Sequence, residues 1–345
     1  MQLSDAQTPD VLALADGVVI PGVMAARITD SACSASDRVQ VTFAFNAAPA
    51  SYWTAWMASS LEVRIGIDGG WTSLFLGVVD LIEFDMTNGT VEIEGRDLTA
   101  LLIDCVVEES YPNLTASDIA EQLATQVGLT PQVTATTGLV GRYWSSEWSR
   151  AALGNYGKAR SGWDMLVWLA AEEGFAVYVT GSQLYFGPTA INSAAPAVIY
   201  PSDCISLKLE RSLRLAGDIA ITVRSWNSRT KQSCSPTASV PGVGAATWRK
   251  VFVRPNLQIA DAEQLALREA GVLSQHERVV SASLPGEFTI GARDQLMLAG
   301  SGIDFDQIYI VDEIERVIDA ENGFVEHIRA RAASPGRSAT ISGNG

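Results

Sequence analysis

Two stretches far apart in the chain follow one written pattern and decide the fold. Val79-Asp-Leu-Ile-Glu83 leads to Asn88-Gly-Thr-Val-Glu92, and Val311-Asp-Glu-Ile-Glu315 leads to Asn322-Gly-Phe-Val-Glu326, with Arg96 or Arg329 shortly after. Each stretch predicts a β-hairpin. The Asn88-Gly89 pair favours a type I′ turn, because both central residues of that turn need positive φ. We therefore expect two similar β-regions separated by a segment of another kind.

Short strands surround the first of these hairpins. Leu61–Ile67 alternates apolar and polar residues, as a strand with one buried face does. The expected strands are Val11–Ala15, Val18–Ile28, Arg38–Phe45, Leu61–Ile67, Leu74–Phe84 and Thr90–Glu94. Regular short strands of this kind are typical of a β-barrel or a β-sandwich.

The middle of the chain changes to α+β character. Thr115 with Asp118, and Ser161 with Asp164, are capping boxes that predict two helix starts. We expect Gly128 and Gly174 to end these helices. A β-hairpin then follows over residues 175–186. The region 138–160 between the helices is rich in Trp, Gly and Ser and has no periodicity.

Strand character returns after Cys204. The expected strands are Ile205–Leu209, Asp218–Trp226, Val251–Val253, Arg278–Leu284, Gln295–Leu298, Ile308–Ile318 and Phe324–Ala330. A helix is predicted over Asp261–Leu273, with Asp261 and Gln264 as a capping pair. Residues 228–247 predict a long mobile loop. We divide the chain into a first β-domain (1–108), an α+β insertion (109–203), a second β-domain (204–333) and a flexible C-terminal tail (334–345).

Composition excludes several classes of protein. The 345 residues include 39 acidic and 24 basic ones, a formal charge of −15, and 47% are hydrophobic. Such a chain can build packed cores, unlike a disordered one. Its acidity argues against gripping nucleic acid through phosphates. We expect neither a signal peptide nor a membrane helix, because the N-terminus lacks a basic, apolar leader and no apolar run is long enough.

No residues combine into a recognisable catalytic, cofactor or metal site. His276 and His327 lack ligand spacing, and the Gly242 region lies in a Ser/Pro-rich stretch unsuited to a dinucleotide. The acid pairs Glu108-Glu109 and Glu172-Glu173 are adjacent residues that point apart. The four cysteines are most simply reduced and buried; a disulfide or an iron–sulfur cluster is the alternative. They are Cys33, Cys105, Cys204 and Cys234. We therefore assign no catalytic residue, metal or cofactor.

The order of several motifs resembles the baseplate hub proteins of contractile phage tails. This late-control or tail-hub family is related to the hub part of type VI secretion spike proteins. The motifs are Leu74-Phe-Leu-Gly-Val-Val-Asp80, Val91-Glu-Ile-Glu-Gly-Arg-Asp-Leu98, Leu101-Leu-Ile-Asp104, Thr115-Ala-Ser-Asp-Ile-Ala120, Val127-Gly-Leu129, Ser161-Gly-Trp-Asp-Met-Leu166, Ala170-Ala-Glu-Glu-Gly-Phe-Ala-Val-Tyr-Val179 and Leu184-Tyr-Phe186. The likeness spans roughly residues 10–330.

The resemblance implies a mainly β fold with an α+β insertion, in which two similar tube-type β-barrels flank a smaller α+β region. It further implies a non-enzymatic homotrimer whose six barrels match a tail tube and whose three-fold symmetry matches a separate trimeric spike. Tube-initiator, tape-measure and baseplate wedge proteins would be its other partners in the virion tail, after synthesis in the host cytoplasm. DNA would pass through the lumen without specific binding, and an acidic lumen would repel it.

Two alternatives belong to other functional classes. A tail-associated cell-wall hydrolase would need an ionisable cluster in a cleft. A glycan-binding tail module would rest on the tryptophans, although such residues are more often buried in cores or interfaces. They are Trp53, Trp56, Trp71, Trp144, Trp148, Trp163, Trp168, Trp226 and Trp248.

Overall fold

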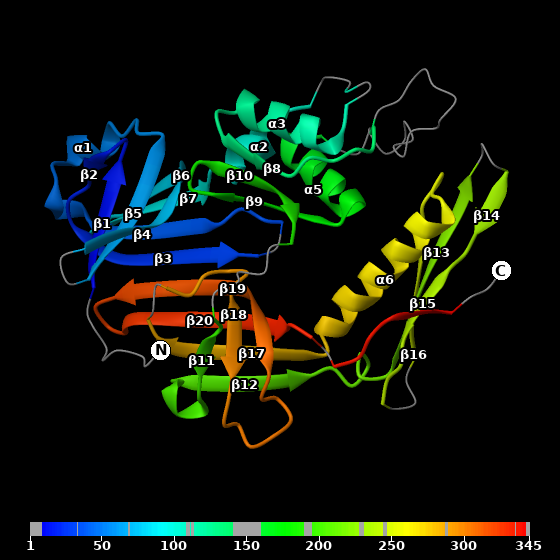
Figure 1. Cartoon of the computed structure of the whole chain (residues 1–345). Coiled ribbons are helices and arrows are strands. Elements are labelled where there is room, and N and C mark those ends of the chain that lie inside the picture. The colour runs from blue at the N-terminus through cyan, green and yellow to red at the C-terminus, as the bar shows by residue number, and fades with distance from the viewer. Residues whose placement is uncertain are drawn as a thin grey trace.

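The protein is mainly β, and most of its helical residues lie in two places, with one short α-helix elsewhere (Figure 1). The computed structural model describes residues 9–32, 34–67, 70–107, 111, 114–140, 160–189, 195–227, 231–243, 247–286, 289–334 and 336–342. Most strands belong to one 13-stranded sheet. None of the helices in this described part is long and apolar enough to cross a membrane.

The first half of the large sheet wraps around an apolar core. Its order is β3-β4-β7-β6-β5-β1-β2, and all neighbours in this half pair antiparallel. The strands are β1 (Asp10–Ala15), β2 (Val18–Val19), β3 (Val23–Ser31), β4 (Arg38–Ala44), β5 (Ser60–Ile67), β6 (Gly70–Asp85) and β7 (Thr90–Asp97). Alternate residues such as Val41, Phe43, Val63 and Ile93 are fully buried, and α1 (Ala50–Thr54) adds Trp53 to this core.

The second half has its own core. Its strands are β11 (Ala197–Ile199), β12 (Ser206–Arg211), β17 (Arg278–Pro285), β18 (Gln295–Leu298), β19 (Ile308–Asp319) and β20 (Gly323–Ala332). Val280, Leu296, Tyr309 and Ile328 are among the side chains at its centre. The two halves form one sheet because β3 pairs antiparallel with β19.

The insertion packs two helices on a small sheet above the first half (Figure 1). Its elements are α2 (Thr99–Asp104), α3 (Ala116–Gln126), β8 (Thr130–Val133), α5 (Gly162–Glu173), β9 (Phe175–Thr180) and β10 (Gln183–Pro188). Both predicted capping boxes are confirmed, and Gly174 ends α5 in a left-handed conformation. Most of the region 138–160 lies outside the described residues.

A further unit interrupts the second half. It is built mainly from residues 218–275 and completed by a strand near the C-terminus, and we call it the C-terminal unit. Here α6 (Ile259–Gln275) covers one face of a five-stranded sheet, burying Ala262, Ala266 and Ala270. The strands are β13 (Asp218–Asn227), β14 (Gln232–Cys234), β15 (Thr237–Val240), β16 (Thr247–Val253) and β21 (Thr340–Ser342). The helix starts before Asp261, and its N-cap Gln258 makes no side-chain cap, so the predicted capping pair is wrong.

Two predicted flexible segments contribute strands to this unit. Within 228–247, β14 and β15 both pair with β13, so the prediction of a long loop is wrong for the described residues. The tail 334–345 was expected to be flexible, yet β21 pairs with β15. β14 and β15 are ordered by the strand that precedes them in the chain, whereas the tail is ordered by a strand about a hundred residues earlier. The division into domains at 108, 203 and 333 stays a prediction.

Candidate functional site

Each half of the large sheet contains four strands in the same order. We call β3-β4-β7-β6 the first repeat and β12-β17-β20-β19 the second. The ladder pairs align them residue by residue, since Ile82 lies opposite Ile93 as Ile314 lies opposite Ile328. Because β19 pairs with β3, the two repeats follow each other in the same direction. The predicted internal repetition is confirmed.

A β-bulge occurs at the same place in both repeats. The ladder shifts register at Asp80 in β6 and at Asp312 in β19. Arg96 donates to both carboxylate oxygens of Asp80, at 2.6 and 2.8 Å, and Arg331 pairs with Asp312. Arg331 rather than Arg329 is therefore the counterpart of Arg96, because the second hairpin extends further before its turn.

The two hairpin turns are also stabilised in the same way, by an aspartate side chain. Asp85 and Asp319 stand at their starts, and each accepts hydrogen bonds from two backbone amides that follow it. Only the glycines take positive φ, 66° at Gly89 and 72° at Gly323. The predicted type I′ turn at Asn88-Gly89 is wrong, because the aspartate stabilises a loop longer than that turn's two residues.

One ladder pair inside the repeats changes from apolar in the first to charged in the second. Phe84 and Val91 meet in the first repeat, and Arg316 and Glu326 take the same places in the second. The latter two form a buried ion pair, with 2.9 Å between Nε and Oε1. Arg316 also donates to the carbonyl of Ile290. A charge pair thus replaces an apolar pair within one backbone pattern.

The outward sides of the two repeats form one continuous polar surface, which we call the joined face. Its charged residues include Arg27, Arg38, Asp80, Glu83, Glu92, Glu94, Arg96, Lys208, Glu210, Glu313, Glu315, Arg329 and Arg331. Arg27 Nη1 lies 3.4 Å from Glu315 Oε1, so an ion pair crosses the boundary between the repeats. A depression of about 330 Å³ beside Arg27 and Arg96 lies on this face.

A second feature is an acidic cavity at the end of the first repeat. It has a volume of about 890 Å³ and lies between this repeat, the insertion and the second half. Burial, with repulsion from Asp30 and Asp97, raises the pKa of Asp37 to about 8. Burial raises the pKa of Asp97 to about 6. The described residues hold no cluster of His, Cys, Asp or Glu suited to a metal ion.

One arginine from the second half reaches this cavity. Arg293 takes a left-handed φ of 76°, which costs conformational energy for a residue with a side chain. Its guanidinium donates to the carbonyl of Ser31 at 2.9 Å and lies 3.7 Å from Asp30 Oδ1. It also lies 4.0 Å from the ring centre of Tyr178 in the insertion. Arg293 therefore joins three parts of the molecule.

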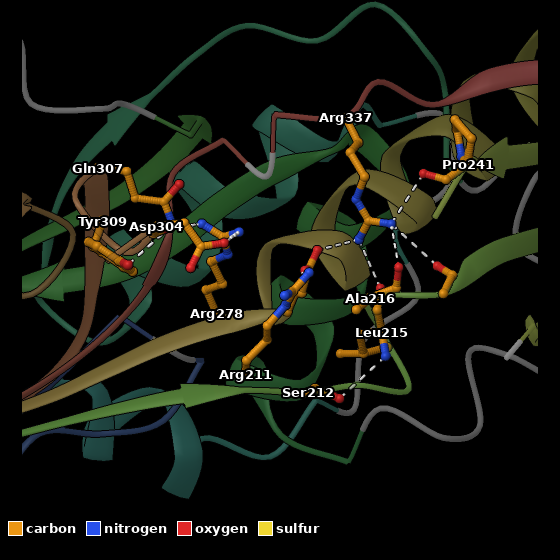
Figure 2. Close-up of polar contacts among 12 residues, drawn as sticks. Arg211, Ser212, Leu215, Ala216, Pro241, Arg278, Asp304, Gln307, Tyr309 and Arg337 are labelled. Atoms are coloured by element: carbon orange, nitrogen blue, oxygen red, sulfur yellow. Dashed lines mark hydrogen bonds and ion pairs between the residues drawn. The ribbon is translucent and has the colours of Figure 1, made fainter. Parts of the chain in front are cut away.

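The corresponding end of the second repeat is lined by arginines (Figure 2). Arg278 binds Asp304 at 2.6 Å, and Arg211 binds the buried Glu277 at 3.1 Å. Arg337, from the segment expected to be flexible, also pairs with Glu277. Its guanidinium further donates to backbone carbonyls, which are those of Leu215, Ala216, Gly217 and Pro241. The C-terminal segment is therefore fastened across this end.

The residues singled out from the sequence do not come together. Burial and two arginines lower the pKa of His276, whereas His327 Nδ1 lies 2.8 Å from Ser283 on the joined face. Glu172 lies 3.6 Å from Arg254. Glu108-Glu109, Cys33, Trp144 and Trp148 lie outside the described residues. The other three cysteines are free, but they are half-buried, so the prediction that they are buried is wrong for them.

The tryptophans are mostly packed. Trp53 and Trp163 are buried and donate to backbone carbonyls of Phe45 and Ser34. Trp71 and Trp226 are the exposed ones within the described chain, and they stand on different sheets. The two exposed tryptophans therefore share no platform, whereas Trp53 and Trp56 stack on each other with 6.3 Å between ring centres.

Similar proteins were found among solved structures. No family model matches the sequence, and no curated protein matches it. A tail protein from Neisseria meningitidis MC58 superposes with a TM-score of 0.72 at 14% identity, covering 95% of this chain and 97% of that one. The prophage MuSo2 43 kDa tail protein from Shewanella oneidensis gives 0.66 at 16% identity, with the same coverage.

A third similar structure comes from a secretion system. The E. coli c3393 protein, a type VI secretion component, gives a TM-score of 0.52 at 11% identity, covering 93% of this chain and 77% of that one. The c3393 protein exhibits structural similarity to the T4 bacteriophage tail proteins gp27 and gp5. The mainly β fold with an α+β insertion, and the resemblance to tail hub proteins at the level of that fold, are confirmed. This chain has the fold of phage tail proteins.

Proposed function

We propose that this protein is the structural hub of a phage tail baseplate. Three copies form a ring that joins a six-fold tail tube to a trimeric spike. The observation that carries the proposal is the direction of the repeats: both run the same way in one sheet. Three chains then offer six equivalent repeats to the tube. The insertion and the C-terminal unit occur once per chain, so a surface built from them has three-fold symmetry.

The joined face is the surface that would line the channel. The opposite side of its strands packs against the two apolar cores, so this polar side is left to meet the passing tape-measure protein and DNA. Asp80 is neutralised by Arg96. Among the remaining charges on this face the carboxylates outnumber the basic groups, which favours repulsion of DNA over binding.

The role is non-enzymatic, and the partners are other tail proteins. They would include the spike, tube or tube-initiator proteins, and wedge proteins, all within the virion tail. The similar folds of tail proteins and of a type VI secretion component support this assignment.

The test is the mass and shape of the assembly. Native mass spectrometry should show a trimer, alone or with the spike protein of the same tail, and electron micrographs should show rings. A chain that stays monomeric in both samples contradicts the proposal. In a separate assay, duplex DNA at low salt should not bind firmly to the ring, and firm binding would exclude a repellent channel.

A further inference from the structure

The joint between the two repeats is a template for a joint between two chains. Inside the chain, β3 pairs with the part of β19 that follows the bulge. β12 is the counterpart of β3, and β6 after its bulge is the counterpart of that part of β19. Among the described strands, β12 pairs only with β17, and β6 beyond the bulge pairs only with β7. Two matching strand edges are therefore open.

We propose that β6 of one copy pairs antiparallel with β12 of the next, in the register of β19 with β3. We further propose that Glu210 makes this joint conditional. The inference rests on the proposed ring and names the edges that build it.

The ladder pairs transfer the register. Glu315 lies opposite Thr29 in the internal joint. Glu83 is the counterpart of Glu315, because each stands two positions after the first residue beyond the bulge. Glu210 is the counterpart of Thr29, through the pairing of β3 with β4 and of β12 with β17. Glu83 of one copy therefore meets Glu210 of the next.

The ion pair across the internal joint has a counterpart in this register. Arg27 reaches Glu315 over 3.4 Å. Lys208 takes the place of Arg27, and Glu83 takes that of Glu315; both are exposed. Lys208 of the next copy would therefore lie beside Glu83 with the opposite charge.

Both open edges also expose apolar side chains. Leu81 and Met86 are 46% and 69% exposed on or next to β6. Ile205 and Leu213, which flank β12, are 63% and 77% exposed. Exposed apolar groups beside an unpaired strand edge favour pairing with another strand. Within the register, Met86 would lie opposite Leu207.

Two carboxylates distinguish the joint between chains from the internal one, because Glu210 takes the place of Thr29 and Asp85 takes that of Val317. The internal joint has the neutral Thr29 opposite its glutamate, but the joint between chains would place two carboxylates directly opposite each other. Such a pair is destabilising. Lys208, which the same register places directly opposite Asp85, has to offset all three carboxylates. The internal joint therefore forms on folding, whereas the joint between copies needs a high concentration or a partner that gathers them.

Sedimentation velocity of surface variants tests the register. Glu210→Thr copies the internal joint and should tighten self-association by about two- to fivefold per joint. Lys208→Glu should weaken it, and adding Glu83→Lys to Lys208→Glu should restore it. Glu313→Thr, on the same face but at the internal joint, is the matched control and should leave self-association unchanged. All these residues are exposed, so circular dichroism should show unchanged folding.

A cross-link locates the joint. Glu83→Cys with Glu210→Cys should form a disulfide between chains, because directly opposite Cβ atoms lie about 4.5–5.5 Å apart. Glu94→Cys with Glu210→Cys should not. Rings without this cross-link would overturn the joint and leave the proposed function standing. Cross-linked open chains without rings would support the joint and contradict the function. A Glu210→Thr variant that stays monomeric, together with a Glu83→Cys/Glu210→Cys variant that forms no disulfide between chains, would overturn the inference.

Discussion

The two repeats share a backbone but end in opposite charges. The end of the first is lined by carboxylates, and the counterpart positions of the second carry two arginines and an alanine. In ladder order these are Asp30, Asp37 and Asp97 against Arg211, Arg278 and Ala332.

Each end holds a different neighbour. The carboxylates meet Arg293 and, through it, Tyr178 of the insertion. On the other side, Arg211 shares Glu277 with Arg337 of the C-terminal segment. The opposite charges therefore allow the same four-stranded repeat to bind the insertion in its first copy and the C-terminal segment in its second. This is what a chain needs if it presents six-fold surfaces on one side and three-fold surfaces on the other.

The largest effect on stability should come from removing one partner of the buried ion pair inside the second repeat. Glu326→Ala leaves the buried guanidinium of Arg316 without its partner, and we expect a loss of about 3–5 kcal/mol of unfolding free energy. Urea denaturation measures it.

The matched variant makes the two repeats alike. Arg316→Phe with Glu326→Val copies Phe84 and Val91, and should be neutral or stabilising by about 1–4 kcal/mol. If the double variant were as unstable as Glu326→Ala, the ion pair would be necessary to the second repeat and the interiors would not be interchangeable.

The acidic end should make the stability of the protein depend on pH through Asp37. The pKa of Asp37 is raised from 3.8 to about 8, so its buried carboxyl is protonated when folded and ionised when unfolded at neutral pH. A raised folded pKa gives stability that is complete below the unfolded value and lost as pH rises through the folded one. Between pH 5 and pH 9 we expect a loss of about 2–4 kcal/mol.

Asp37→Asn should flatten this pH dependence, because its amide stays neutral and still accepts from the Ser31 amide. Urea denaturation over the pH range measures both proteins. An equally steep curve for the variant would exclude Asp37 as the titrating group.

Local signals made part of this structure predictable. The capping boxes at Thr115 and Ser161 lie within four residues, so the helices they begin could be predicted. The internal repeat could also be predicted, because the residues at its bulge and its turn form short motifs in the sequence. Asp85 and Asp319, each three residues before Asn-Gly, were a further signal that would have corrected the turn type.

Other parts depend on contacts between distant residues. β21 is short and polar, and it is ordered by pairing with β15, about a hundred residues earlier in the chain. Arg337, just before β21, also binds a carbonyl about a hundred residues earlier. The carboxylates Asp30, Asp37 and Asp97 lie at the ends of three strands and meet only after the sheet forms. Neither arrangement leaves a pattern in a short window of sequence.

Removing the arginine that fastens the C-terminal segment should cost less than breaking the buried pair. Arg337→Met removes one partner of Glu277 and the donors to four carbonyls, for an expected loss of about 2–3 kcal/mol. Hydrogen exchange should rise in β21 and β15 while the first repeat is unchanged.

Arg211→Met is the matched control, because Arg211 binds Glu277 alone and is more exposed. It should have a smaller effect and leave β21 protected. Equal exchange in β21 for both variants would mean that Glu277, rather than the carbonyl contacts, holds the segment.

The smallest effect should come from the bulge ion pairs, which are alike in position but not in burial. Asp80 is about one-third exposed, so Asp80→Ala should cost about 0.5–1 kcal/mol. Asp312 is buried, so in Asp312→Ala water can replace the lost ion pair with Arg331 less well. The variant should lose about 1–3 kcal/mol of unfolding free energy. Thermal unfolding of the two variants measures the difference. Equal losses would show that the bulge backbone, rather than the burial of the pair, sets the contribution of this aspartate.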